Sequence, residues 1–358
     1  MPIMNIIPYL HYQPKITQTC SDERWVSVIG RTTIGERCHF SDLVTLRADG
    51  HTINVGSDCW FGEYATVHIA DSAYGASLAS HVTVGRFGLV HGCSIGEDCV
   101  LGEHAVVMDN AQVGSGSVIC SDSVVPPGKQ LESGWLYQGV PAKPIRKIDS
   151  VELATLRKIV KSRKDGDGAA LVLSNNPVAN FKHEPGEGVM VNQNDECYIA
   201  PTAAIVGSLE MAAQSSIWFA VEIDAKDATV QIGAASNIQD SSRITLDAGE
   251  CLKIGKRVTV GHNVRLNACE VGDSMHTWDG RHDWERHHST RWGSCGRRRC
   301  YGSKHCSDRR YDLVRQSSET IPSTFRTKQK TFLHWRGCLQ AIHKKLQTKL
   351  LSLCGVFN

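Results

Sequence analysis

The chain has 358 residues, of which 41% are hydrophobic and 21% charged, and its formal net charge is +2. This length can hold two domains with sizeable cores, the composition is typical of soluble globular proteins, and the small net charge indicates no particular class of partner. No apolar run approaches the roughly 18 to 20 residues of a spanning helix, and residues 1–20 lack the charged start and apolar middle of a secretory signal. We therefore predict neither a membrane span nor secretion.

The N-terminus and the cysteines bear on the compartment. Before Asp22 the chain has one Lys, no Arg and no acidic residue, which supports a transit peptide poorly. The 14 cysteines show no paired framework, and Cys38, Cys59 and Cys99 each follow an aliphatic residue by four positions, where a small side chain packs. We therefore expect a reducing compartment, either the cytoplasm or the mitochondrial matrix.

Large apolar residues recur every six residues in the first half of the chain. Neither the 3.6-residue period of an α-helix nor the two-residue alternation of a strand produces this spacing, which is typical of a solenoid. We predict a left-handed parallel β-helix, in which these side chains fill the axis of a triangular prism and three six-residue faces complete one coil. Several of them precede Gly, as in Ile34-Gly35 and Val113-Gly114. The positions are Val28, Ile34, Phe40, Leu46, Val55, Phe61, Val67, Ile95, Leu101, Val107, Val113, Ile119 and Val125.

The loop His68–Ser77 interrupts this repeat and is predicted to bulge out of the solenoid. With the loop excised, Val90 lies on the same face as Val67, one coil further along. His68 and His91 directly follow these two inward residues. We therefore expect the two imidazoles to stack on one outer face of the β-helix.

An amphipathic segment, Asp149–Lys164, closes the first half and is predicted to form one α-helix. Asp149 and Glu152 could form a capping box at its start. Residues 1–165 are then a first domain, and the Gly-, Asn- and Pro-containing stretch 166–195 is interpreted as a linker. The predicted apolar side of the helix consists of Val151, Leu153, Leu156, Ile159 and Val160.

The six-residue period restarts after the linker and repeats the first half at an offset of 177, which becomes 176 from Ile254 onward. The change of one residue reflects the longer loop of the first half. We interpret residues 196–275 as a second, incomplete β-helix and as a tandem copy of the first. Its repeat positions are Ile199, Ile205, Met211, Ile217, Ile223, Ile232, Ile238, Ile244, Ile254, Val260, Leu266 and Val271.

The period ends after Gly272, since positions 277, 283, 289, 295 and 301 are not aliphatic. Residues 276–358 are basic and non-repetitive, their cysteines lack paired zinc spacing, and they contain no known nucleic-acid motif, so we expect no nucleic-acid partner. Trp278 and Trp284 are six residues apart, and each is followed by a residue whose codon begins with G. Because the Trp codon is TGG, a shift of one nucleotide would read GGG, a Gly codon, at both positions. We interpret 276–358 as a frameshifted or disordered tail.

The repeat, the two stacked histidines and the end of the first half resemble the γ-class carbonic anhydrases. The resemblance covers Ile29–Lys164 nearly whole and Ile199–Gly272 as a truncated second copy, and residues 126–147 resemble the family's PPG turn and G-x-PAK segment. It implies left-handed β-helices that assemble as trimers with a metal site at each interface. We expect a homo-oligomer or pseudo-trimer whose interfaces join halves of unlike type.

The resemblance also implies the metal ligands, two from one subunit and the third from its neighbour. They correspond to His68 in ATVHIA, His91 in LVHGC and His262 in VTVGHNV, so we predict one composite site. The halves complement each other, because each has a different residue where its own remaining ligands would lie: Arg86 in the first half, and Thr245 and Asn267 in the second.

Three imidazoles leave a position on Zn²⁺ for water, whose pKa the metal lowers to about 7. The resulting hydroxide could attack carbon dioxide, so the resemblance implies a carbonate dehydratase, a metal-dependent lyase acting on carbon dioxide and bicarbonate. Fe²⁺ or Co²⁺ could replace Zn²⁺. A Gln that the family places near the metal corresponds to Gln239 in NIQD, where the first half has Gly62. Gln239 is predicted to orient the hydroxide or the bicarbonate, or else to be an ordinary polar residue of the solenoid.

One charge pattern opposes a contact between unlike halves. The family pairs the Arg of an Arg-Gly-Asp segment with the neighbour's Asp, and this segment corresponds to Arg47-Ala48-Asp49 in the first half and Asp224-Ala225-Lys226 in the second. A contact of unlike halves is then expected to bring Arg47 toward Lys226, or Asp49 toward Asp224, which is repulsive unless the geometry has shifted. A partly exposed ion pair is worth only about 0–1 kcal/mol, so the ligand pattern carries more weight.

Two other classes of function fit the same sequence. One is a non-catalytic structural or assembly subunit of a mitochondrial complex, with His68 and His91 as surface residues of an eroded copy. The other is a hexapeptide acyltransferase, which needs a catalytic His and no metal triad, so metal content separates the classes. We interpret the remaining solenoid histidines as solvated side chains: His39, His51, His81 and His104.

Overall fold

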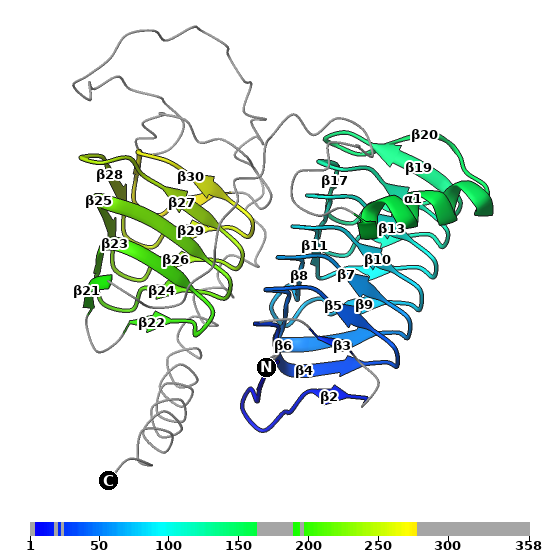
Figure 1. Cartoon of the computed structure of the whole chain (residues 1–358), viewed down its shortest axis with the longest axis horizontal. Helices are drawn as coiled ribbons and strands as arrows, with labels where there is room; N and C mark the ends of the chain where they lie inside the picture. Colours follow the sequence, from blue (N-terminus) through cyan, green and yellow to red (C-terminus); the bar gives the residue numbers. More distant parts are fainter. Residues whose placement is uncertain (1–3, 18–20, 23–24, 163–188, 194–196, 278–358) are drawn as a thin grey trace, which may run out of the picture. The chain divides into compact units, whose positions relative to one another are not determined.

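The computed structural model describes residues 4–17, 21–22, 25–162, 189–193 and 197–277, all within one compact unit of the chain (Figure 1). They form a left-handed parallel β-helix architecture with one α-helix in the described part, which confirms the predicted fold class. No described helix is long and apolar enough to cross a membrane.

The first β-helix, drawn from blue to green in Figure 1, is built from two hydrogen-bonded sheets. One sheet covers two faces, because β6 (Thr45–Val55) bends around a corner and pairs with β8 (Thr66–His68) at its start and β9 (Ala76–Leu78) at its end. In the described part this sheet has 12 strands, the others being β1 (Asn5–Ile7), β2 (Lys15–Ile16), β4 (Ser27–Ile34), β11 (Leu89–His91), β12 (Ser94–Ile95), β14 (Val106–Val107), β15 (Gln112–Val113), β17 (Val124–Val125) and β18 (Gln130–Leu131). The third face has eight described strands: β3 (Ser21–Asp22), β5 (His39–Phe40), β7 (Trp60–Phe61), β10 (Thr83–Val84), β13 (Val100–Leu101), β16 (Val118–Ile119), β19 (Trp135–Gln138) and β20 (Lys143–Lys147).

The second β-helix, drawn in green to yellow, repeats this plan. Its larger sheet consists, among described residues, of β21 (Val189–Gln193), β23 (Ala204–Met211), β25 (Glu222–Ile232), β27 (Arg243–Thr245), β28 (Cys251–Ile254), β30 (Arg265–Leu266) and β31 (Glu270–Val271). The smaller sheet consists of β22 (Tyr198–Ile199), β24 (Ser216–Ile217), β26 (Asn237–Ile238), β29 (Thr259–Val260) and β32 (His276–Thr277).

The boundaries of this second β-helix differ from expectation at both ends. Strand β21 lies within the predicted linker 166–195 and pairs in parallel with β23, while residues 163–188 and 194–196 are outside the described residues. Strand β32 continues the solenoid past Gly272, because a buried Thr277 occupies the predicted aliphatic position and accepts a hydrogen bond from Gly261 N. The predicted tail beyond it, 278–358, lies outside the described residues.

The six-residue repeat forms the axis of each β-helix. All 13 predicted positions of the first half lie in one buried cluster, and those of the second half lie in or against another. Equivalent positions of successive coils are in register: Phe40 pairs with Phe61 across β5 and β7, and their rings stack with centroids 5.0 Å apart. Since side chains at this spacing point to the axis of each β-helix, the six-residue repeat specifies the architecture.

Stacked coils explain why Gly follows several inward residues. A Cβ at Gly35 would lie 2.7 Å from the carbonyl carbon of Gly56, and one at Gly114 would lie 2.5 Å from Ser133 N. The next coil approaches too closely for any side chain there.

The buried cysteines have a related structural role. Cys38 Sγ donates to Gly56 O at 3.1 Å, Cys59 Sγ to Ala79 O at 3.2 Å, and Cys99 Sγ to Gly114 O at 3.2 Å. Each thiol thereby satisfies a carbonyl at the corner of the next coil, which confirms that small side chains pack at these positions.

Helix α1 (Ser150–Ser162) packs on the eight-stranded face of the first β-helix. Asp149 Oδ1 accepts hydrogen bonds from Val151 N at 2.9 Å and Glu152 N at 2.8 Å, as an N-cap does. The predicted capping box is only half formed, because Glu152 pairs with Arg146 instead. The predicted apolar side was wrong at Val151, which is 75% exposed, whereas Leu153 and Val160 are buried.

Candidate metal centre

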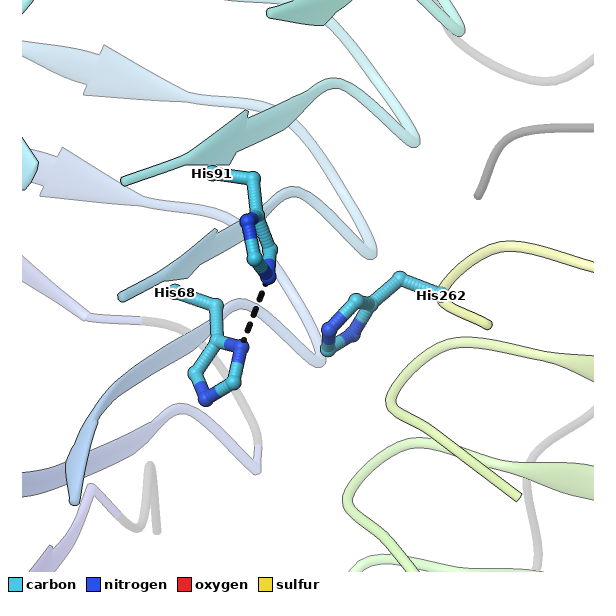
Figure 2. Close-up of side chains that lie close together, drawn as sticks. All are labelled: His68, His91 and His262. Atoms are coloured by element: carbon cyan, nitrogen blue, oxygen red, sulfur yellow. Dashed lines mark hydrogen bonds between the residues drawn. The ribbon is translucent and has the colours of Figure 1, made fainter. Parts of the chain in front are cut away.

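His68 and His91 stack as the excised loop predicts. Their strands β8 and β11 pair in register, with Val67 opposite Val90 and His68 opposite His91. Val67 and Val90 are fully buried, so the next residue on each strand must point outward. Nδ1 of His68 and Nε2 of His91 lie 3.2 Å apart (Figure 2).

His262 reaches this pair from the second β-helix. It lies in the tight turn between β29 and β30, next to Asn263 in the left-handed conformation (φ 55). Its ring centroid lies 4.9 Å from that of His68 and 5.4 Å from that of His91 (Figure 2). One ring nitrogen from each residue lies within 4.8 Å of the other two. The structure thus brings together all three predicted ligand residues, which we call the histidine cluster.

Each imidazole of the histidine cluster has a carboxylate at one ring nitrogen. Nε2 of His68 lies 3.1 Å from Asp49 Oδ1, and Nδ1 of His262 lies 3.2 Å from Asp240 Oδ2. The remaining contact joins His91 Nδ1 to a carboxylate oxygen of Asp109. A carboxylate accepts, so each of these nitrogens carries the proton and the opposite nitrogen presents a lone pair.

This donor set fits a divalent transition metal. With Nε2 of His68 and Nδ1 of His91 protonated, the two nitrogens that face each other at 3.2 Å both present lone pairs. Two tetrahedral ligands about 2.0–2.1 Å from a zinc ion are roughly 3.3 Å apart, close to this separation. Burial, with the Arg47 guanidinium and the other two imidazoles, holds the pKa of His68 well below its usual range. His68 is therefore neutral at pH 7, as a ligand must be.

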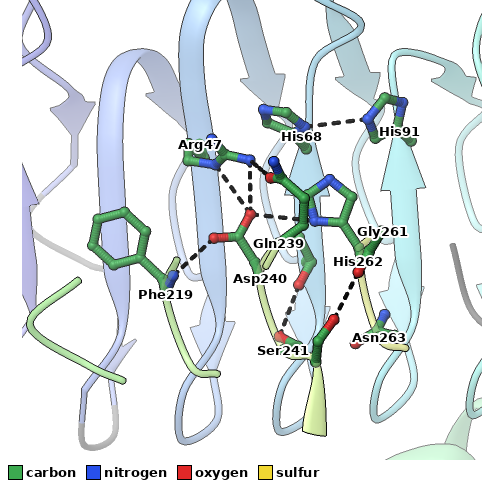
Figure 3. Close-up of polar contacts among 12 residues, drawn as sticks. Arg47, His68, His91, Phe219, Gln239, Asp240, Ser241, Gly261, His262 and Asn263 are labelled. Atoms are coloured by element: carbon green, nitrogen blue, oxygen red, sulfur yellow. Dashed lines mark hydrogen bonds and ion pairs between the residues drawn. The ribbon is translucent and has the colours of Figure 1, made fainter. Parts of the chain in front are cut away.

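Arg47 connects the two β-helices beside the histidine cluster (Figure 3). Its side chain is 2% exposed and bonds Asp240 at 3.0 Å in the second β-helix, Asp49 at 2.8 Å in its own, and Gln239 Oε1 at 2.5 Å. The guanidinium also lies over the Trp218 ring, 4.2 Å from its centroid. Burial alone would raise the pKa of Asp240, but Arg47 and His262 lower it to about 2.

The expected repulsion between unlike halves was therefore wrong. Arg47 meets Asp240, at a corner of the second β-helix, and not Lys226, which is exposed. Asp49 pairs with Arg47 of its own strand rather than facing Asp224. Arg47 thus pairs with Asp240, which is not the residue of the second half at the position equivalent to Asp49. A comparison of equivalent positions could not identify it.

A second group of contacts holds the unlike halves together. Tyr64 donates its hydroxyl to Glu222, which pairs with Arg243 at 3.0 Å. The Arg243 guanidinium lies over the rings of Tyr64 and Phe87, at 4.6 and 4.5 Å from their centroids. Asn263 Nδ2, next to His262, donates to Phe87 O at 3.1 Å. These buried contacts position His262 against the first β-helix.

The remaining predicted positions behave differently. Arg86 lies 3.3 Å from Glu63 in its own β-helix, and Thr245 is exposed. Gln239 Oε1 accepts a hydrogen bond from Arg47, which lies beside the histidine cluster. Gln239 Nε2 donates to Asn237 Oδ1 at 2.6 Å. His104 was expected to be solvated but is 4% exposed and stacks on a phenylalanine ring, so that interpretation was wrong.

Sequence reasoning missed Asp109 and Asp240. Asp240 directly follows the singled-out Gln239. Asp109 lies 18 residues after His91, which is one residue past the equivalent position in the next coil, because Val90 pairs with Val107 at an offset of 17. The coil length therefore indicates the neighbourhood of Asp109 and not the residue itself. The Arg47–Asp240 pair depends on packing between the two β-helices and has no equivalent signal.

Comparison with known proteins places this architecture in a family. The model of bacterial transferase hexapeptide (six repeats) matches residues 89–127. Protein YrdA of Escherichia coli is 32% identical over 156 residues, which are 42% of this chain and 85% of YrdA. Gamma carbonic anhydrase 2, mitochondrial, of Arabidopsis thaliana is 28% identical over 141 residues, 38% of this chain and 51% of that protein. A hexapeptide transferase family protein of Anaplasma phagocytophilum has a similar crystal structure, with 28% identity, a TM-score of 0.41, and coverage of 44% of this chain and 92% of that one.

The chain belongs to the hexapeptide-repeat superfamily of γ-carbonic-anhydrase-like proteins.

Proposed function

We propose that His68, His91 and His262 hold one divalent metal ion, Zn²⁺ or alternatively Fe²⁺ or Co²⁺, and that the chain hydrates carbon dioxide reversibly. The observation that carries this proposal is the convergence of three imidazoles from two β-helices, each with a carboxylate at its outer nitrogen. The gamma carbonic anhydrase relative supports the choice of reaction. A zinc ion held by three imidazoles supplies a water of lowered pKa as the nucleophile.

The residues of the chain would prepare and enclose this site. The carboxylates keep the imidazoles in the tautomers that bind metal. Arg47 fixes the Gln239 carbonyl, and one N–H of the Gln239 amide is bonded to Asn237. The second N–H is left to donate to the nucleophile or to bicarbonate, which is the orienting role that we propose for Gln239.

We also propose that the two β-helices are tandem copies of one ancestral unit, in domains 1–165 and 196–275. The offset of their repeat positions, which is 177 and becomes 176 after the longer loop of the first half, and the shared order of their strands support this origin. Each copy then retains complementary ligands, so one chain forms the interface that subunits of relatives would form. The mitochondrial matrix or the cytoplasm is the proposed compartment, and further association into a homo-oligomer or pseudo-trimer remains a prediction.

The proposal is tested by measuring the rate at which the full chain hydrates carbon dioxide, with a pH indicator in a stopped-flow instrument. Protein loaded with zinc is expected to accelerate hydration, and removing the metal with dipicolinate should abolish the acceleration until zinc is restored. Zinc-loaded protein that binds the ion but leaves the rate at the uncatalysed level would favour the non-catalytic subunit over the enzyme.

A further inference from the structure

We infer that Asp109 is a positioning residue of the metal centre, which holds His91 in the tautomer and orientation that direct its Nε2 at the ion. This inference rests on the proposed metal site. Asp109 and His91 both belong to the first β-helix, and Asp109 lies in the coil after the one that carries His91.

The backbone fixes Asp109 on both sides. Asn110 N donates to Gly92 O at 2.8 Å, which ties this turn to the coil that carries His91. Gly128 N donates to Asp109 O at 2.8 Å, which ties it to the following coil. Asn110 has a φ of 57, so the corner turns sharply directly after Asp109. The carboxylate is therefore placed by three stacked coils and does not depend on a flexible loop.

This placement determines which nitrogen of His91 is available. Asp109 Oδ1 accepts from Nδ1, so Nε2 keeps its lone pair and faces His68. Without the carboxylate the neutral ring could protonate either nitrogen and could rotate about its Cβ bond. Outer carboxylates of this kind contribute about 10–100-fold to metal affinity.

Asp109 can be tested without disturbing the contact between the β-helices. Asp49 and Asp240 are 4% and 0% exposed and both pair with Arg47, so their removal would also break that contact. The Asp109 side chain is 38% exposed. Asp98 provides a matched control, because its carboxylate is 47% exposed and pairs with Arg157 of helix α1, away from the histidine cluster.

The experiment measures the zinc Kd of the full chain by competition with a chromophoric chelator. Asp109→Ala is expected to raise the Kd about 10–100-fold, Asp109→Asn less, since its amide oxygen still accepts, and Asp98→Ala not at all. Long-range ¹H–¹⁵N spectra of the metal-free protein should show His91 as the Nδ1–H tautomer in the wild type and not in Asp109→Ala.

The outcomes separate this inference from the proposed function. Unchanged Kd and unchanged His91 tautomer in Asp109→Ala would overturn the positioning role while leaving the metal site intact. A wild-type chain that binds no zinc would overturn both. If Asp109→Ala does not fold, Asp109→Asn with wild-type Kd and the other tautomer would overturn the role instead.

Discussion

Replacing Arg47 with alanine is expected to lower the free energy of unfolding by about 3–5 kcal/mol. Arg47, Asp49 and Asp240 are almost completely buried, so removal of the guanidinium leaves two carboxylates without their cation. The substitution also removes the contact with Trp218 in the second β-helix. Urea unfolding followed by tryptophan fluorescence measures the loss.

Two further variants identify the cause of the stability loss expected in Arg47→Ala. Lys226→Ala removes an exposed cation of the second β-helix and should change stability by less than about 0.5 kcal/mol. Replacing Arg47, Asp49 and Asp240 together by alanine should destabilise less than Arg47→Ala alone, because no buried charge then remains unpaired. A loss below about 1 kcal/mol in Arg47→Ala would contradict a buried ion pair between the β-helices.

His68→Ala is expected to eliminate both the bound metal and carbon dioxide hydration. Two imidazoles at the histidine cluster cannot replace the three protein ligands that a catalytic zinc site requires. Thr245→Ala is the matched control, since Thr245 occupies the equivalent position of the second half and is exposed. That variant should keep wild-type metal content and rate.

Elemental analysis measures the metal content of His68→Ala and Thr245→Ala, and the hydration assay measures their rates. Circular dichroism checks that both variants fold. Full metal content in His68→Ala would remove His68 from the ligand set. Loss of metal from Thr245→Ala would show instead that the second β-helix holds the ion on its own outer face.

The solenoid could be predicted from the sequence because its information is periodic. Inward residues such as Phe61 recur at a fixed spacing and occupy equivalent buried positions along the axis. This spacing can be read from the sequence without knowledge of any contact. The stacking of His68 and His91 followed from the same arithmetic once the loop was removed. Helix α1 was located, but Val151 was assigned to the wrong side, because periodicity does not fix where a short helix rests on a sheet.

The arrangement of the site was only partly predictable. His262 came from its offset to Arg86 together with the family resemblance, since neither half has a complete ligand set. Arg47 was expected to meet equivalent positions of the other half, but it pairs with Asp240 at a corner. The packing of one β-helix on another depends on side-chain shapes that do not repeat, so no period encodes it.

The most direct test of the composite site is the metal content of the wild-type chain and of His262→Ala, purified identically, loaded with zinc, desalted and analysed by inductively coupled plasma mass spectrometry. The wild type should retain about one divalent ion per chain, and His262→Ala should retain none, because it loses the ligand that the described part of the second β-helix supplies. Stoichiometric metal in His262→Ala, or none in the wild type, would contradict a site shared between the two β-helices.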